Sequence, residues 1–302
     1  MMNLTLPIFA DADKAREHLE SIRWPDGPIC PHCGVVDEAT LVQGKSHRPG
    51  LYQCNACREP FSVTVGTVME SSHIPLNKWV LGFHLMASSK KGVSAHQLHR
   101  MLGVTYKSAW FMAHRIREAM APALDAGPVG GEGMIVEADE TEISPSRKSR
   151  RRPRNQNKKV ISLIERGGRV RSIRIDSTNV ETIRPILTAN VHKDSRLMTD
   201  TAAQYKKRRM GFEQHEMVNH SAGEYVRDDA HVNSAEGFFS VFKRGLVGTY
   251  QHMSEQHLHR YLAEFDFRAS NRAALGVSDE VRAARAIKGT AGKRLTYRDA
   301  AQ

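Results

Sequence analysis

The four cysteines of the chain lie in two short pairs near its start, Cys30-Pro-His-Cys33 and Cys54-Asn-Ala-Cys57, with twenty residues between the pairs. Each CxxC turn directs two sulfurs at one point, and two such turns supply the four thiolates of a tetrahedral Zn²⁺ site. The spacing therefore predicts a zinc ribbon with Cys30, Cys33, Cys54 and Cys57 as ligands. Four unrelated buried cysteines or two disulfides are the alternative, but nothing else in the sequence indicates an oxidising compartment.

The charge of the chain indicates a polyanionic partner. Lys and Arg number 44 against 33 acids, which gives a formal charge of +11 and a pI of about 9.6 over 302 residues. Such an excess is typical of proteins that bind DNA or RNA, although a merely soluble basic protein is the alternative. A zinc ribbon often grips nucleic acid or holds a neighbouring module, so the two features agree.

No uninterrupted apolar run approaches the ~20 residues of a membrane span. The N-terminus, MMNLTLPIFADADK, has neither the basic start nor the long apolar stretch of a secretory signal. We therefore expect a cytoplasmic, nucleoid-associated protein whose thiols are reduced, with no membrane partner.

The first 125 residues predict two domains. Residues 1–74 combine a short helix, from about Asp11 to Trp24, with the zinc ribbon, whose strands are expected around residues 51–53 and 61–65. Residues 75–125 are helical, and there Ser94 and Thr105 are placed to cap two successive helices that Gly103 separates. Helix, short glycine-containing turn and helix form the outline of a helix-turn-helix.

The second helix of this module carries four basic residues, Lys107, His114, Arg115 and Arg117. An ordinary helical hairpin with a solvated basic side is one interpretation. Beside a zinc ribbon, we favour a DNA-binding face.

After the glycine-rich linker at 126–131, the pattern changes from helical to extended. Strands are expected at 134–143, 160–164, 169–175, 196–200 and 216–219, with helices at 180–191 and 231–271. This order predicts an α/β or α+β domain at 130–275, followed by a C-terminal tail at 276–302. The whole chain is thus predicted to be multidomain.

Two basic runs accompany this domain. Pro145–Lys159 holds eight basic residues and no acid, and Lys206–Arg209 is a second cluster. Such runs are usually solvated loops. Because the first run interrupts a domain, we expect it to lie along a phosphate backbone in the complex with nucleic acid.

Three acids are candidates for catalysis. Asp139 is expected to end the strand in IVEADETEI, Asp200 ends the strand in RLMTD, and Glu236 borders the apolar stripe of the helix in HVNSAEGFFSVFKRGL. If that helix packs on the sheet, the three carboxylates converge, and their repulsion favours a bound Mg²⁺ or Mn²⁺. Two such ions support in-line attack on phosphate. Surface acids at helix and strand ends are the alternative interpretation.

The order of zinc ribbon, helical module, VEADETEI, LMTD and HVNSAEGFFSVFKRG resembles the insertion-sequence transposases of the ISXO2-like group, over residues 24–272. The resemblance implies a ribonuclease-H-like catalytic domain with a DDE metal site, in which Asp139 and Asp200 are the two aspartates. Thirty-five residues separate Asp200 from Glu236, and Lys243 follows seven residues later, as in DDE recombinases. Part of the group uses asparagine as third ligand, so Asn233 is the alternative to Glu236.

One departure from the group follows the first aspartate, where Ser144-Pro145 replaces a common Gly-Gly. It affects the expected loop rather than the metal site.

The resemblance implies a DNA transposase. It is expected to bind the terminal inverted repeats of its element and to act, as at least a dimer, on double-stranded transposon ends and target DNA. Cleavage and strand transfer are expected to need Mg²⁺ (or Mn²⁺), with two ions at the site of Asp139, Asp200 and Glu236, beside one structural Zn²⁺. The alternatives are a non-enzymatic zinc-ribbon DNA-binding protein, an inactive transposase remnant, or a nuclease for RNA–DNA hybrids.

Overall fold

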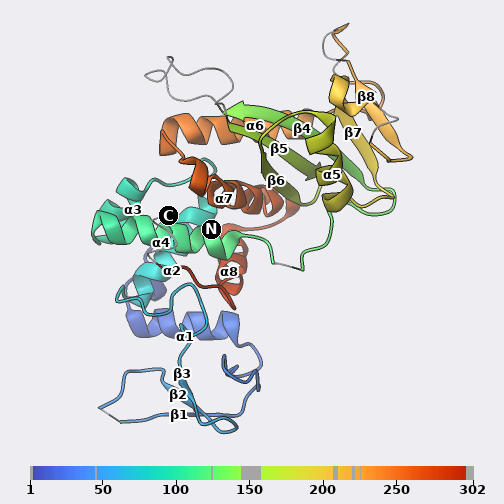
Figure 1. Cartoon of the computed structure of the whole chain (residues 1–302). Coiled ribbons are helices and arrows are strands. Elements are labelled where there is room, and N and C mark those ends of the chain that lie inside the picture. The colour runs from blue at the N-terminus through green and yellow to red at the C-terminus, as the bar shows by residue number, and fades with distance from the viewer. Residues whose placement is uncertain are drawn as a thin grey trace. The chain divides into compact units, whose positions relative to one another are not determined.

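The computed structural model describes residues 3–44, 46–123, 125–143, 158–206, 210–219, 222–224 and 226–296. The chain forms two compact units (Figure 1). The first unit comprises residues 1–89, 93–121 and 277–302, and the second comprises 90–92 and 122–276. Every helix within the described ranges is too short or too polar to cross a lipid bilayer.

The structure groups the chain differently from the four predicted segments. The zinc ribbon, the helical module and the C-terminal segment lie in one compact unit, and the predicted domain at 130–275 falls in the other. Most of the basic run Pro145–Lys159 and residues 207–209 of the second basic cluster lie outside the described residues.

The ribbon of the first unit is a small antiparallel sheet in the order β1-β2-β3. Its strands are β1 (Ala39–Leu41), β2 (Tyr52–Cys54) and β3 (Pro60–Phe61). Trp24 packs edge-on against the rings of Tyr52 and Phe61, with centroids 5.6 and 5.7 Å apart. β1 is a strand that the sequence did not predict, and the strand expected at 61–65 ends at Phe61.

Helices supply the rest of the first unit: η1 (Pro7–Phe9), α1 (Ala12–Arg23), α2 (Leu76–Ser88), α3 (Ala95–Leu102), α4 (Tyr106–Met120) and α8 (Asp279–Lys288). The predicted caps are confirmed. Ser94 Oγ accepts a hydrogen bond from the Gln97 amide at 3.1 Å, and Thr105 Oγ1 accepts one from the Ser108 amide at 3.2 Å. Gly103 ends α3 in the left-handed region at φ 58°, where a side chain is strained.

The basic side predicted for α4 is wrong for three of its four residues. His114, Arg115 and Arg117 are 0, 9 and 2 % exposed. Arg115 donates to the carbonyls of Glu70 and Leu295, both at 3.1 Å, and lies 4.4 Å over the ring of Phe111. α4 is therefore a core helix in which Arg115 is buried against backbone acceptors, and Lys107 is the one exposed residue of these four.

The predicted C-terminal tail contains a helix that the sequence analysis did not identify. α8 begins at the cap Ser278, buries Ala283, Ala286 and Ile287, and packs against α2. Its apolar residues are mostly alanines interspersed with arginines, so the helical apolar pattern of α8 is weak in the sequence.

The second unit is built on a five-stranded mixed sheet in the order β6-β5-β4-β7-β8. Its strands are β4 (Ile135–Ile143), β5 (Lys158–Glu165), β6 (Val170–Ile175), β7 (Arg196–Asp200) and β8 (His215–Val218). The central strand β4 runs parallel to β7, which runs parallel to β8, whereas β5 and β6 extend the sheet antiparallel on the other side.

Three long helices accompany this sheet, with a π-helical turn and short 3₁₀ turns: α5 (Val180–Asn190), α6 (Asn233–Gly245), α7 (Leu258–Ser270), η7 (Leu246–Tyr250), η4 (Ala203–Tyr205), η8 (Glu255–His257) and η9 (Ala273–Leu275). α5 covers one face of the sheet, and α6 and α7 cover the other (Figure 1). The predicted strands and helices of this domain are thus present, within one or two residues of the expected ends for most of them.

Strand alternation assigns each residue of β4 to one of these two faces. Ala138 belongs to a buried cluster with Leu187 of α5, whereas Ile143 belongs to a cluster with Phe238 and Phe242 of α6. The odd-numbered residues of β4 therefore face α6 and α7, and the even-numbered residues face α5. This arrangement confirms a mixed α/β domain.

Candidate metal centre and acidic strand

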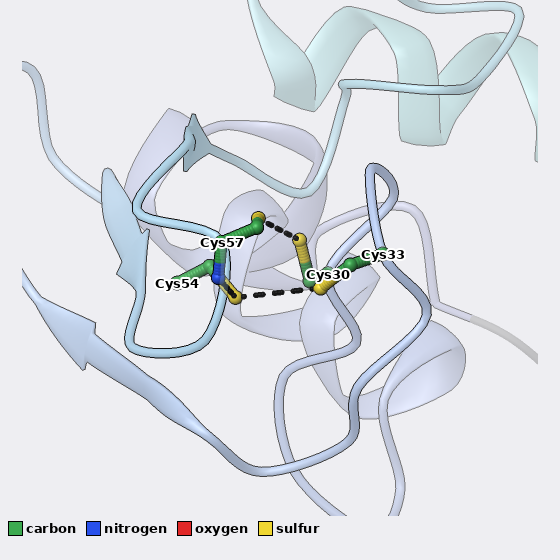
Figure 2. A group of neighbouring side chains, drawn as sticks. All are labelled: Cys30, Cys33, Cys54 and Cys57. Carbon is green, nitrogen blue, oxygen red and sulfur yellow. Dashed lines mark hydrogen bonds between the residues drawn. The ribbon is translucent and has the colours of Figure 1, made fainter.

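The four cysteines meet at one point (Figure 2). Cys30 Sγ lies 3.7 Å from Cys57 Sγ, and Cys33 Sγ lies 3.6 Å from Cys54 Sγ. A tetrahedron with Zn–S bonds of about 2.3 Å has S–S edges of about 3.8 Å. The predicted ligand set therefore fits a structural Zn²⁺ in both donor chemistry and spacing.

The two cysteine turns have the same local backbone. The amide of Gly34 donates to the carbonyl of Cys30 at 2.9 Å, and the amide of Arg58 donates to the carbonyl of Cys54 at 3.0 Å. Each donor follows the second cysteine of its pair and has a positive φ, 79° for Gly34 and 65° for Arg58. The first turn uses glycine there, and the second forces an arginine into the left-handed region.

The second turn also stabilises the thiolate of Cys54. The backbone N–H of Cys57 donates to Cys54 Sγ at 3.5 Å, and this hydrogen bond is the main cause that lowers the pKa of Cys54 to about 6. A thiolate is the form that binds metal.

Asp139 and Asp200 lie on neighbouring parallel strands. Asp200 ends β7 as expected, but the expectation that Asp139 ends its strand is wrong, because β4 pairs with β5 as far as Ile143. The β4–β7 pairing joins Ile135 to Arg196 and Glu137 to Met198. That pairing ends at Glu137 and Met198, and Asp139 and Asp200 each follow two residues later, so both aspartates lie just beyond the paired part of the two strands. Both side chains are half-buried.

Both aspartates are on the face of the sheet that α6 covers. Asp139 alternates with Glu137, whose carboxylate accepts hydrogen bonds from the amides of Ser234 and Ala235 at 2.8 and 3.1 Å. Asp200 alternates with Met198, which packs with Val232 just before α6.

The first turn of α6 carries both candidates for the third ligand. Asn233 is its first residue and Glu236 follows one turn later, and both are exposed. Lys243 is also exposed and lies two turns beyond Glu236 on the same side of the helix. Because Glu137 holds the start of α6, the structure brings this turn to the strand that carries Asp139.

The three carboxylates do not form a tight cluster. Among the described residues, the four cysteines are the only group of three or more Cys, His, Asp or Glu whose ligand atoms all lie within 4.8 Å of one another. Like charges keep carboxylates apart without a cation between them. Two ions about 3.5–4 Å apart are held by ligands that spread over a wider space.

Two further acids of β4 are functional candidates that the sequence analysis missed. Glu137 is fully buried, and it accepts a hydrogen bond from Arg166 Nε at 2.6 Å. Glu140 points to the opposite face and accepts from Tyr205 Oη at 2.6 Å and from Gln204 Nε2 at 2.9 Å. The motif VEADETEI shows these acids, but the partners are 29 to 98 residues away in the chain.

The electrostatics around Glu140 reflect how close the two aspartates are. Burial, followed by the charges of Asp139 and Asp200, raises the pKa of Glu140 to about 7, although the bonds from Tyr205 and Gln204 oppose the shift. Burial and the same three carboxylates raise the pKa of Tyr205 well above its usual range. Both aspartates therefore act on the same two neighbouring groups, which agrees with the strand register.

Two segments of the chain match models of known protein families. Residues 10–59 match the family model described as a transposase zinc-ribbon domain, and residues 125–270 match the one described as an ISXO2-like transposase domain. The chain is also 28% identical, over 284 residues, to an uncharacterized protein in transposable element ISH50 of Halobacterium salinarum. That alignment covers 88% of this chain and 93% of the relative.

Proposed function

Because the chain belongs to the ISXO2-like group of insertion-sequence transposases, we propose that it binds the terminal inverted repeats of its element and cuts and joins DNA at Asp139, Asp200 and a third ligand on α6. The observation that supports this proposal is the pairing of β4 with β7, because Asp139 and Asp200 each follow its last pair by two residues, on the face covered by α6. We further propose that the second unit is ribonuclease-H-like. A mixed five-stranded sheet with its first strand in the centre supports that assignment.

The donor set suits Mg²⁺ or Mn²⁺. Two aspartates, Asp139 in the middle of β4 and Asp200 at the end of the adjacent β7, offer with Glu236 or Asn233 the hard oxygen ligands that these ions prefer. We prefer Glu236, because a carboxylate binds a divalent cation better than a neutral amide does. When bound, the ions would supply activation of the attacking oxygen and stabilisation of the leaving oxygen.

The proposed reaction has two steps. In the first, a water oxygen attacks the phosphorus at the element's end, the P–O3′ bond breaks, and a free 3′-hydroxyl and a 5′-phosphate remain. In the second, that 3′-hydroxyl attacks a phosphodiester of target DNA and displaces another 3′-oxygen. Asp139 and Asp200 would hold the divalent ions, and Lys243 would hold the DNA near the site through a phosphate oxygen.

We propose that the zinc ribbon and the exposed edge of the α3–α4 pair bind the inverted repeat. In a helix-turn-helix, the N-terminal residues of the second helix contact base edges. Here that turn exposes Tyr106 and Lys107, and Arg100 is exposed on α3. Tyr106 stacks on His96 with ring centroids 4.3 Å apart, so its ring is held in place at the surface. Joining two element ends calls for at least a dimer.

The test uses labelled duplexes that carry the inverted repeats flanking the gene, incubated with purified protein and Mg²⁺. We expect cleavage at the element's end and transfer to target DNA, and we expect Asp139→Asn and Asp200→Asn to abolish both while still binding the duplex. Asp176→Asn is the control, because this exposed aspartate follows β6 and lies outside the proposed site. Wild-type protein that binds but never cleaves would favour a non-enzymatic DNA-binding protein or an inactive remnant.

The third ligand is tested by comparing Glu236→Gln with Asn233→Ala in the same assay. Loss of strand transfer in the glutamine variant alone would assign the role to Glu236. Near-normal transfer in that variant, with loss in Asn233→Ala, would assign it to Asn233.

A further inference from the structure

The central strand β4 carries three acids within four residues, Glu137, Asp139 and Glu140. Glu137 and Asp139 point to the face that α6 covers, and Glu140 points to the opposite face. The two glutamates are not candidates for direct metal binding, because their carboxylates are engaged by hydrogen bonds and ion pairs with protein groups. Their partners lie in the two segments that carry the other proposed ligands.

Glu137 holds the start of α6. Its Oε2 accepts hydrogen bonds from the amides of Ser234 and Ala235 at 2.8 and 3.1 Å, and its Oε1 accepts one from Ser234 Oγ at 3.0 Å. The residue preceding the helix, Val232, offers no side-chain cap. Glu137 therefore satisfies N–H groups that a helix start leaves without intrahelical partners, and its charge is favourable at that end.

Arg166 reinforces this attachment. It donates to Glu137 Oε1 at 2.6 Å, to the carbonyl of Asp229 at 2.7 Å and to that of His231 at 2.9 Å. The segment that leads into α6 is therefore fixed to the same buried carboxylate as the first turn, which carries Asn233 and Glu236.

Glu140 holds the segment that follows Asp200. Its carboxylate accepts hydrogen bonds from Tyr205 and Gln204 of η4, which begins three residues after Asp200. Tyr205 is fully buried, so the hydroxyl is fixed. Asp200 Oδ1 itself accepts from the Ala202 amide at 3.0 Å, and Asp139 Oδ1 accepts from the Glu140 amide at 2.8 Å.

We propose that Glu137 and Glu140 are positioning residues. Each fixes one of the other two ligand-bearing segments relative to β4, the strand that carries Asp139. Glu137 sets the place of the third ligand through the first turn of α6, and Glu140 sets the place of Asp200 through η4. The inference rests on the proposed function, since it takes Asp139, Asp200 and an α6 residue as the metal ligands. Residues that orient metal ligands in this way typically change metal affinity 10- to 100-fold when removed.

The test measures Mn²⁺ affinity by titration calorimetry, beside the thermal midpoint and the strand cleavage of each variant. Tyr205→Phe and Tyr250→Phe form a matched pair, because each removes one hydroxyl that donates at 2.6 Å to a glutamate. Tyr250 donates to Glu264, which is buried on α7. We expect Tyr205→Phe to weaken Mn²⁺ binding about tenfold. Tyr250→Phe should lower the thermal midpoint by a comparable amount but leave the Mn²⁺ affinity unchanged.

Glu137 is tested by a double-mutant cycle with Glu236. Glu137→Gln is expected to weaken Mn²⁺ binding about tenfold in the wild-type chain, and to have little further effect once Glu236→Gln or Asn233→Ala has removed the third ligand. If Glu137→Gln does not fold, Ser234→Ala, which removes one of its bonds, replaces it in the cycle.

The outcomes separate this inference from the proposed function. Wild-type protein that neither binds Mn²⁺ at millimolar concentration nor cleaves DNA refutes the proposed function. The positioning roles alone are overturned if wild-type protein both binds Mn²⁺ and cleaves DNA, but the variants show no specific effect. In that case Tyr205→Phe and Tyr250→Phe would have the same Mn²⁺ affinity, and the effects of Glu137→Gln and of removing the third ligand on that affinity would be additive.

Discussion

Asp139 and Asp200 each lie two residues beyond Glu137 and Met198, the last paired positions of the parallel strands β4 and β7. Glu140, next to Asp139, has its pKa raised by burial and by both aspartates. The second unit therefore gathers three carboxylates on the central strand β4 and its neighbour β7, in a chain whose formal net charge is +11. A divalent cation bound between these carboxylates would reduce their repulsion.

Removing Zn²⁺ is expected to unfold the ribbon. A structural zinc site contributes about 10 kcal/mol or more of apparent binding free energy at neutral pH, and the three short strands of the ribbon bury little without it. Elemental analysis should find one Zn²⁺ per chain, and Cys54→Ser with Cys57→Ser should lose it and lower the thermal midpoint. Metal-free wild-type protein that keeps the midpoint of the zinc-loaded protein would remove this assignment.

Arg58→Gly is expected to stabilise the ribbon. Arg58 has a φ of 65°, in the left-handed region, where a residue with a side chain costs about 1 kcal/mol relative to glycine. Gly34 occupies the equivalent place in the other cysteine turn, so Gly34→Ala should destabilise by a similar amount. The resistance of bound zinc to a competing chelator measures both changes. If both variants retained zinc better, or both retained it less well, than the wild type, the two turns would not share the same geometry.

Asp266 is expected to make stability depend on pH. It is buried on α7 and accepts hydrogen bonds from the amide and hydroxyl of Ser172 at 2.6 Å, and burial raises its pKa from 3.8 to about 7. The folded chain thus keeps a proton that the unfolded chain loses. The free energy of unfolding should therefore fall as the pH rises from about 4 to 7, by up to about 1.4 kcal/mol per pH unit.

Asp266→Asn removes this titrating group, so the free energy of unfolding should depend less steeply on pH. The loss of one acceptor for Ser172 should lower that free energy by the same amount at every pH. Urea denaturation between pH 5 and pH 8 measures the difference from wild type, with the exposed Asp176→Asn as control. Parallel wild-type and Asp266→Asn curves would mean that the folded carboxyl titrates near its ordinary pKa.

Arg100→Ala and Lys107→Ala are expected to weaken binding to the inverted repeat. Each removes an exposed cation from the α3–α4 edge. For every phosphate that is no longer neutralised, the slope of log K against log salt concentration should become shallower by about 0.9. Lys14→Ala is the control, because this lysine is exposed on α1 and pairs with Glu17 at 2.9 Å. If both variants kept the wild-type affinity for the inverted repeat and the wild-type salt dependence, the DNA would not bind at the α3–α4 edge.

Local signals in the sequence predict much of this fold. Ser94, Gly103 and Thr105 fix the ends of α3 and α4 because capping depends on neighbouring residues alone. The sulfur cluster was predicted from two CxxC spacings, since four thiolates at one metal are specified by two short turns.

Interactions between distant parts of the chain account for what the sequence did not predict. Arg115 resembles a solvated basic residue until its acceptor at Leu295, 180 residues later, is known. Glu137 resembles an ordinary strand acid, and its role at the start of α6 depends on Ser234, 97 residues away. Periodicity reports which face a residue occupies but not which partner lies on that face.

The most direct test of the account is a crystal structure of the protein soaked in Mn²⁺, with the cation located by anomalous scattering. The account predicts a peak that carboxylate oxygens of both Asp139 and Asp200 coordinate, with Glu236 or Asn233 completing the protein ligands. Carboxylates that each bind a separate cation, or a peak that avoids both aspartates, would contradict it.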